Sequence, residues 1–199
     1  IHVFDWDDTS KIISMISDNK TRVHARNCEV AWLNHNDVRG FLNSYHLQGY
    51  CRNQSSVFGL FYNGMLIQMM SFGMSRYNHN YQWELLRLCT HSDYYVVGGA
   101  ERLFHHFIKC KNPHSVISYC DLSKFHGDVY ERLGFTLHHR SKPSKVWSKG
   151  NHKITDNLLR QRGFDQIFGT EYGKGTSNEE LMIKHGWIPI YDCGQSVYV

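Results

Sequence analysis

The sequence predicts an α/β (α+β) fold with a mixed central sheet flanked by helices, and three observations lead to this prediction. Two apolar segments at residues 57–62 and 65–72 flank Asn63-Gly64, a dipeptide that accepts positive φ in tight hairpin turns. A third apolar strand at 83–89 leads through a pair of glycines into an amphipathic helix at 100–110. The alternation then continues with a strand, a short helix and a further strand, at 116–120, 128–133 and 135–139.

The elements on either side of this middle region are shorter. Before it we predict a strand at 1–4, a helix capped by Thr9 or Ser10, a strand over 22–33 and a helix over 36–45. After it the pattern predicts a small C-terminal extension, made of a hairpin of 146–148 with 152–154, a helix over 178–186 and strands at 188–191 and 196–199.

Length and composition exclude several classes of protein. The chain has 199 residues, of which 41% are hydrophobic, enough for one sizeable core or two small ones. No run of about 18 apolar residues is present, so we expect no membrane span. The six cysteines form no Cys-x-x-Cys pair, which favours a reduced, intracellular compartment, and Cys89 and Cys120 fit small core positions. Because the chain begins with Ile1, we expect it to be part of a longer protein.

Histidine and aspartate clusters invite a metal interpretation, which we do not favour. The pairs His105-His106 and His138-His139 are adjacent in sequence, so their side chains point in different directions, and no cysteine or carboxylate has ligand spacing to them. The aspartates near the N-terminus fit charges at the start of a helix. We expect no metal in this chain.

Positive charge is concentrated in one segment. The net charge is only +4, yet residues 138–162 carry seven lysine and arginine residues against Asp156 alone. Such a block is typical of phosphate contacts, and a solvated surface hairpin explains it equally well. On the first interpretation the segment binds double-stranded DNA, with Trp147 either stacking on a base or lying as an ordinary cross-strand aromatic. The phosphate contacts would come from Arg140, Lys142, Lys145, Lys149 and Lys153.

Two segments of the middle region suggest chemistry. Free N–H groups at a helix start can hold a pyrophosphate, and Gly98-Gly99 stand where such a helix begins, although the glycines alternatively allow close packing. After the next strand comes Tyr130-Glu131-Arg132-Leu133-Gly134-Phe135. Together these residues resemble the GNAT superfamily, the Gcn5-related N-acyltransferases, over about residues 26–139.

The resemblance implies acetyl-CoA or another acyl-CoA as the acyl donor. The family's glycine loop holds the coenzyme A pyrophosphate, and the matching positions are Val97, Gly98, Gly99, Ala100 and Arg102. The family's tyrosine often protonates the departing thiolate, which assigns that role to Tyr130 unless it is a core aromatic. The family's loop usually begins with Arg or Gln, where this chain has Tyr95.

An amine acceptor also requires a base that takes its proton. The candidates are Glu84, on the strand at 83–89, and His91 just after that strand. Glu84 alternatively pairs with Arg87 or Arg102.

A narrower resemblance extends over nearly the whole chain. The runs Tyr45–Gly49, Met70–Gly73, Glu84–Cys89 and Ile190–Gly194 are similar to phage proteins of the homing-endonuclease type, in which a GNAT-like domain follows a Vsr-like nuclease domain. The opening Ile-His-Val-Phe is similar to the last strand of that nuclease. The resemblance therefore implies a nuclease remnant at 1–21, a GNAT-like core at 22–139 and a basic extension at 140–199, without the nuclease active site.

Three functions follow from these observations. The first is a DNA-associated region of a phage protein, acting in the cytoplasm of the infected bacterium. The alternative is an active CoA-dependent N-acyltransferase, with a nucleobase or nucleotide as one conceivable acceptor. The third is a degenerate GNAT fold that only mediates protein contacts.

Overall fold

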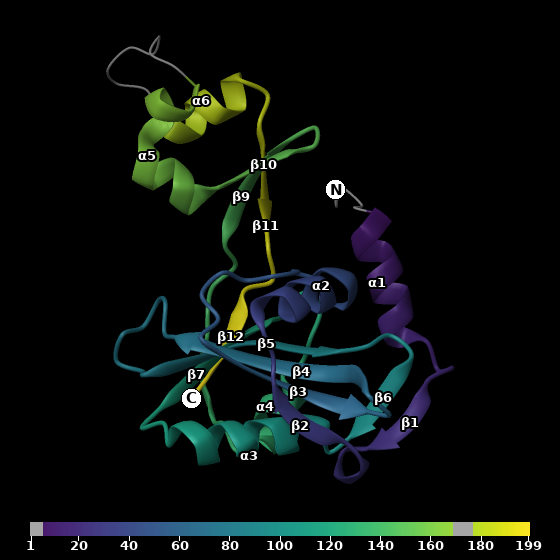
Figure 1. Ribbon diagram of the computed structural model, residues 1–199. Helices are drawn as coiled ribbons and strands as arrows, with labels where there is room; N and C mark the ends of the chain where they lie inside the picture. Colours follow the sequence, from purple (N-terminus) through teal and green to yellow (C-terminus); the bar gives the residue numbers. More distant parts are fainter. Residues whose placement is uncertain (1–5, 169–176) are drawn as a thin grey trace. The chain divides into compact units, whose positions relative to one another are not determined.

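The computed structural model describes residues 6–168 and 177–199, which divide into two compact units (Figure 1). The larger unit holds the described residues within Phe4–Cys120, Gly127–His139 and Val197–Val199, and the smaller holds those within Asp121–His126 and Arg140–Ser196. The last three residues thus belong to the larger unit rather than to the extension predicted over 140–199. The strand predicted at 1–4 lies outside the described residues.

A seven-stranded sheet forms the centre of the larger unit, in the order β2-β3-β4-β5-β7-β12-β8. The first four of these strands pair antiparallel, whereas β5 and β7 are parallel, so the predicted mixed sheet flanked by helices is confirmed. The strands are β2 (Glu29–Trp32), β3 (Ser56–Tyr62), β4 (Met65–Met74), β5 (Trp83–Thr90), β7 (Val116–Asp121), β12 (Gln195–Tyr198) and β8 (Leu137–Arg140).

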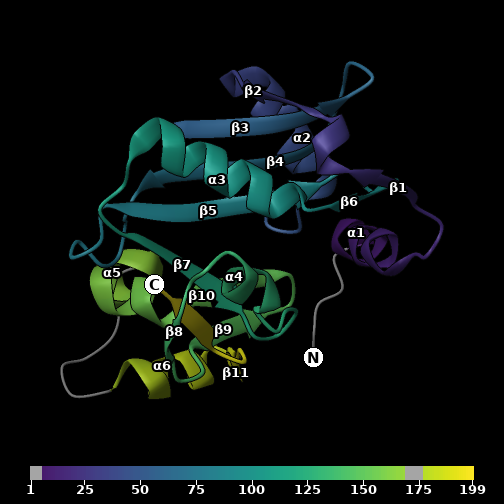
Figure 2. The same ribbon diagram turned by 90° about the horizontal axis from the view of Figure 1, so that it is seen from below.

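Helix α3 (Gly99–Lys111) covers one face of this sheet and α2 (His35–Tyr45) covers the other (Figures 1 and 2). Under α3, the rings of Phe72 and Phe107 stack with their centroids 3.6 Å apart. Cys120 lies in the core under α3 and Cys89 in the core under α2, as predicted for small apolar residues. All six cysteines are free thiols.

The tight turn between β3 and β4 is confirmed. Asn63 has φ 50° and Gly64 has φ 78°, the left-handed conformations that a two-residue hairpin turn requires. The short helix α4 (Asp128–Arg132) is likewise present, and Gly134 after it has φ 90°.

Two features near the N-terminus differ from the prediction. Helix α1 (Trp6–Ile16) begins before the expected caps Thr9 and Ser10, which lie inside it. The strand predicted at 22–33 is divided by a 3-10 turn into β1 (Thr21–His24) and β2. The division has a physical reason: β1 pairs with a separate strand, β6 (Tyr94–Val97), whereas β2 joins the main sheet.

The smaller unit has its own sheet, core and helices. Strands β9 (Lys145–Lys149), β10 (His152–Thr155) and β11 (Ile188–Tyr191) form an antiparallel sheet in the order β10-β9-β11. Helices α5 (Asp156–Phe168) and α6 (Asn178–Lys184) accompany them, and the core consists of Trp147, Leu159, Leu181, Met182 and Trp187. Helix α5 was not predicted, because its sequence carries Gly163 in mid-helix and lacks regular apolar spacing.

Within the described parts of the chain, none of the helices combines the length and the apolar character needed to cross a membrane.

Candidate functional site

A β-bulge in β5 brings two charged residues to the same face of the sheet. The pairing of β5 with β4 shifts register at Leu86, which is the extra residue. An extra residue reverses the alternation of side chains along a strand. Leu85 and Leu88 consequently both pack into the core under α3, and Glu84 and Arg87 share the opposite face.

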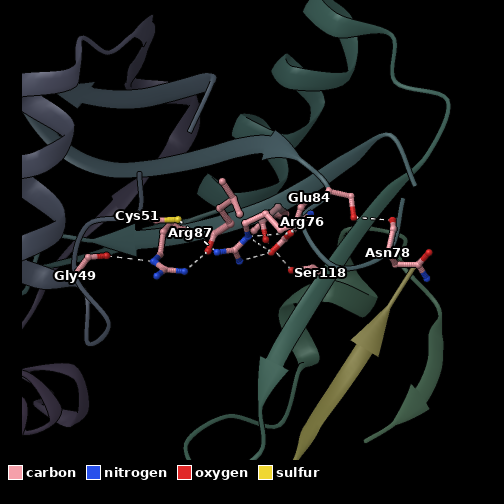
Figure 3. A network of polar contacts seen from close by, with 10 residues as sticks. Gly49, Cys51, Arg76, Asn78, Glu84, Arg87 and Ser118 are labelled. Carbon is pink, nitrogen blue, oxygen red and sulfur yellow. Dashed lines mark hydrogen bonds and ion pairs between the residues drawn. The ribbon is translucent and has the colours of Figure 1, made fainter. Parts of the chain in front are cut away.

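Glu84 is buried and forms an ion pair with Arg76, a residue that follows β4 (Figure 3). Nη2 of Arg76 donates to Oε1 of Glu84 at 2.5 Å, and Nε lies 3.2 Å from both carboxylate oxygens. The backbone N–H of Arg76 donates to Oε2 at 3.1 Å. The hydrogen bonds that Arg76 donates to Glu84 raise the pKa of Arg76, although burial opposes the change. The partner of Glu84 is therefore Arg76, and neither Arg87 nor Arg102 as the sequence suggested.

These contacts restrict the role expected of Glu84 as a base. Both of its oxygens already accept hydrogen bonds from one guanidinium, and its side chain is only 2% exposed. To take a proton from an amine, Glu84 would have to give up part of this ion pair. The arrangement favours a structural and electrostatic role for the carboxylate.

Strands β5 and β7 pair over only three residues and then separate. The last pair is Leu85 with Ser118, and no further ladder pair between these strands forms in the described residues. At that point the Ser118 hydroxyl donates to the Leu85 carbonyl at 3.1 Å. Parallel strands that separate at their carboxyl ends are a common location for ligands in α/β sheets.

The Tyr130 phenol lies at this point of separation. The Ser118 side chain, which donates to the Leu85 carbonyl, is close enough to the phenol to influence its pKa. Burial raises the pKa of Tyr130 above its ordinary value, while the Ser118 hydrogen bond and the Arg87 charge act in the opposite direction. The phenol therefore keeps its proton at neutral pH.

Arg87 lies beside this group, between the Glu84 ion pair and the loop that contains Gly49 (Figure 3). Its Nε donates to the Gly49 carbonyl at 3.2 Å, and Nη1 donates to the Leu86 carbonyl at 2.8 Å. Burial lowers the pKa of Arg87, and the neighbouring Arg76 acts in the same direction. The guanidinium nevertheless remains charged, because its ordinary pKa is far above neutrality.

The start of α3 has the geometry expected of an anion-binding helix terminus. Gly98 caps the helix with φ 72°, and an added Cβ would meet nothing within 4 Å. Gly99 has a packing reason instead, since a Cβ there would lie 1.9 Å from Oε1 of Gln68. Val97 ends β6 and Ala100 is buried in the first turn of the helix.

Two residues near this terminus modify its charge. Arg102 donates to the Ala25 carbonyl, so it ties α3 to the 3-10 turn. Glu101 lies in the first turn and approaches Arg132 at 3.9 Å, which partly offsets its negative charge.

His91 lies away from this group, at the other end of β5. Its Nε2 is 2.8 Å from the Tyr45 hydroxyl, and its Nδ1 accepts the backbone N–H of Asp93 at 3.2 Å. Seven residues of strand at about 3.3 Å each separate His91 from Glu84 by roughly 23 Å. The two predicted bases therefore cannot act on one amine.

The predicted nucleic-acid contacts all lie in the smaller unit, and they divide into two groups. Trp147 is fully buried, and its Nε1 donates to Asp156 at 3.1 Å, so its ring has no exposed face for stacking on a base. Lys145 is held by Asp156 at 3.7 Å and Glu179 at 3.2 Å. The other four side chains are exposed: Arg140, Lys142, Lys149 and Lys153. Lys149 also donates to the His185 carbonyl.

The described residues bring together no group of three histidine, cysteine, aspartate or glutamate side chains that would hold a metal ion. His106 contacts Cys110 at 3.5 Å, and the Nδ1 atoms of His138 and His139 are 2.6 Å apart.

Comparison with known proteins gives weak similarities. No protein-family model matches the chain, and no curated protein matches it. Among solved structures, a Bacillus subtilis acetyltransferase in complex with CoA matches at 10% identity and a TM-score of 0.46, covering 86% of this chain and 96% of that chain. A GNAT family acetyltransferase from Elizabethkingia anophelis with acetyl-CoA bound matches at 12% identity, with the same TM-score of 0.46 and the same coverage. Both TM-scores lie below 0.5.

Sequence reasoning did not find Arg76 or Ser118, and it gave Arg87 only as a partner for Glu84. Arg76 lies in a polar loop, and no periodic pattern connects it with Glu84. Ser118 lies between apolar residues of β7, and a serine inside an apolar strand is the signal that the sequence contains. Its burial shows only in the fold.

Proposed function

We propose that this chain is a CoA-dependent N-acyltransferase. The observation that carries the proposal is the Tyr130 phenol, held by Ser118 at the last pair of β5 and β7. In acyl transfer from a thioester, the amine nitrogen bonds to the carbonyl carbon, the carbon–sulfur bond breaks, and the thiolate takes up a proton. Tyr130 is a protonated group at the position where two parallel strands separate, and it suits the last of these events.

The proton balance at Tyr130 is favourable. After the phenol gives its proton to sulfur, the Ser118 hydroxyl is able to turn and donate to the phenolate. The positive charge of Arg87 stabilises the same state. The proton that the acceptor nitrogen loses then restores the phenol, either through water or directly.

The start of α3 supports binding of the CoA pyrophosphate. Its 13 residues align the peptide dipoles, Gly98 leaves open space before the first turn, and the loop matches the resemblance to GNAT enzymes at Gly98 and Ala100. Tyr95 stands where the family's loop usually has Arg or Gln, so the loop lacks that hydrogen-bond donor, and its one arginine, Arg102, donates to the Ala25 carbonyl.

Calorimetry with CoA and acetyl-CoA tests the proposal. We expect wild-type protein to bind both, and Gly98→Asp to weaken binding at least about tenfold, because a negative charge then faces the pyrophosphate at the helix terminus. Gly64→Asp is the matched control, since Gly64 has φ 78° and equally open space but lies in the β3–β4 turn. Absence of heat with wild-type protein at about millimolar ligand rejects the proposal.

A second candidate function is binding of double-stranded DNA by the smaller unit, as the resemblance to homing-endonuclease-type phage proteins implies. One observation favours it: four basic side chains that the sequence singled out are exposed there, Arg140, Lys142, Lys149 and Lys153. Trp147 and Lys145 do not contribute, because they are engaged within the unit.

A salt titration tests this second candidate. Affinity for duplex DNA should fall steeply from about 50 to about 200 mM salt, because each phosphate contact releases counterions. The combined variant Lys149→Gln and Lys153→Gln should reduce the slope by about two. Absence of binding at low salt, or binding that is independent of salt, counts against it.

A further inference from the structure

The group around Glu84 contains one more positive charge than it can neutralise. Arg76 and Arg87 approach a single carboxylate, and that carboxylate is paired with Arg76. Arg87 has no carboxylate within 4.0 Å in the part of the chain that the structure describes. A partly buried charge without a counter-ion is unfavourable, so such a residue is rarely kept for packing alone.

The hydrogen bonds of Arg87 leave one edge of its guanidinium available. Nε and Nη1 donate to the carbonyls of Gly49 and Leu86, which fix the plane of the group. Nη2 takes part in none of the hydrogen bonds found in the described residues. Figure 3 shows the side chain of Arg87 directed toward Gly49. The guanidinium is thus held in one orientation before any ligand arrives.

A second unsatisfied donor lies directly across the sheet. Ser71 of β4 is the cross-strand partner of Arg87, so both side chains are on the same face. Ser71 is completely buried, and its hydroxyl has no hydrogen-bond partner. An unpaired buried hydroxyl is costly in free energy, and because Ser71 has no exposed area its hydroxyl adds a polar group under Arg87 that solutes do not reach.

The position of this pair relates it to the chemistry proposed above. Arg87 is close enough to Tyr130 and to Glu84 for each to influence its charge. An anion bound to Arg87 therefore lies within electrostatic range of the phenol that protonates the departing thiolate under the proposed function. It does not lie at the start of α3, where the pyrophosphate would bind.

We propose that Arg87, with Ser71 beside it, binds a carboxylate carried by the amine acceptor, so that the substrates are amines of the amino-acid type. This inference rests on the proposed function. A planar carboxylate matches the edge of a guanidinium in geometry and charge, and it can accept from the Nη2 donor of Arg87 that remains. The carboxylate is unchanged in the reaction, in which the nitrogen–carbon bond forms, the carbon–sulfur bond breaks and the amine proton is passed on.

A binding experiment tests the site without CoA. The Nε–Hε signal of Arg87 is followed by NMR in arginine-labelled protein and assigned with Arg87→Met, while N-acetylglycine or N-acetylglycinamide is added. We expect N-acetylglycine to shift this signal and the amide to leave it unchanged. Arg52→Met is the control, because Arg52 is exposed and the variant should keep the shift. No shift, or an equal shift with the amide, overturns the proposal.

A kinetic experiment tests its link to the proposed function. With acetyl-CoA, an amino acid such as phenylalanine should be acetylated at least about tenfold more efficiently than its amide. Arg87→Met should abolish this preference, measured as the ratio of acid to amide efficiencies within each variant, because loss of the charge beside the Tyr130 phenolate affects both substrates alike. CoA affinity should stay nearly unchanged, and Arg87→Lys should restore part of the preference. Equal rates for acid and amide in wild-type protein overturn the proposal. If CoA gives no heat in calorimetry while the NMR shift persists, the proposed function fails and the carboxylate site stands.

Discussion

Two groups of similar side chains lie along β5, and they differ in how far their charges are balanced. Each end combines a tyrosine, a cysteine and at least one ionisable partner: Tyr130, Cys51, Arg76 and Arg87 at one end, and Tyr45, Cys89, His91 and Asp93 at the other. At the first end the cations outnumber the carboxylate. At the second end the Tyr45–His91 pair and the Asp93 backbone satisfy one another.

The difference teaches where a ligand is needed. A group of partners that use each other's donors and acceptors gains little from an added molecule. A group with an uncompensated charge gains a counter-ion. The same types of side chain therefore indicate a binding site at one end of the strand and a structural contact at the other.

Removal of the carboxylate from the charged end should have the largest effect. In Glu84→Leu, the Arg76 guanidinium loses the carboxylate with which it is paired, and we expect the free energy of unfolding to fall by about 3 kcal/mol. Urea unfolding of the full chain measures this change. The double variant Glu84→Leu with Arg76→Met should recover part of the loss. A loss below about 1 kcal/mol would show that the pair is exposed enough to be screened.

The two tyrosines should differ clearly in their effect on catalysis. Under the proposed function, Tyr130→Phe lowers kcat roughly 100-fold with CoA affinity retained, because the phenol supplies a proton to the thiolate. Tyr45→Phe is the matched control and should change kcat less than twofold, although it removes the hydrogen bond between the Tyr45 hydroxyl and His91. Steady-state kinetics with calorimetry decides the comparison. An equal loss in both variants would mean that the effect comes from folding.

The buried thiol at the second end should make stability depend on pH. Burial raises the pKa of Cys89 from 9.0 to about 12. Because the folded pKa is the higher one, the contribution to stability is complete below pH 9 and is lost as pH rises toward 12.

Between pH 8 and pH 10.5 wild-type protein should therefore lose about 2 kcal/mol more than Cys89→Val. Denaturant unfolding at the two pH values measures the difference. Cys110→Val is the control, because Cys110 is an exposed thiol and Cys89 a buried one. The same pH dependence in wild-type protein and in Cys89→Val would contradict the prediction.

Most of the secondary structure of the larger unit could be predicted because local signals agree with the tertiary fold. Asn63-Gly64 requires positive φ, and both residues adopt it. The apolar face of α3, with Leu103 and Phe107, matches the face that is buried. These features depend on neighbours in sequence, which is the information that a single sequence contains.

The smaller unit shows where local signals are insufficient. On its pattern alone, Trp147 could be a base-stacking ring or an ordinary cross-strand aromatic, and the pattern favoured the second. Its burial depends on Asp156 and Leu159 of α5, a helix whose own sequence has weak periodicity. The accessibility of an aromatic residue is decided by the elements that pack against it in the fold, and its own strand pattern does not show them.

By itself, the sequence determined the strand–helix order, the hairpin turn, the glycines before α3 and the presence of a tyrosine after β7. Tertiary structure alone decided which charged groups meet. Simple alternation along β5 places Arg87 on the same face as Leu85, and the bulge at Leu86 moves it to the face of Glu84. Because a single inserted residue reverses every side chain beyond it, pairing with β4 determines whether this strand carries a buried charge or a binding site.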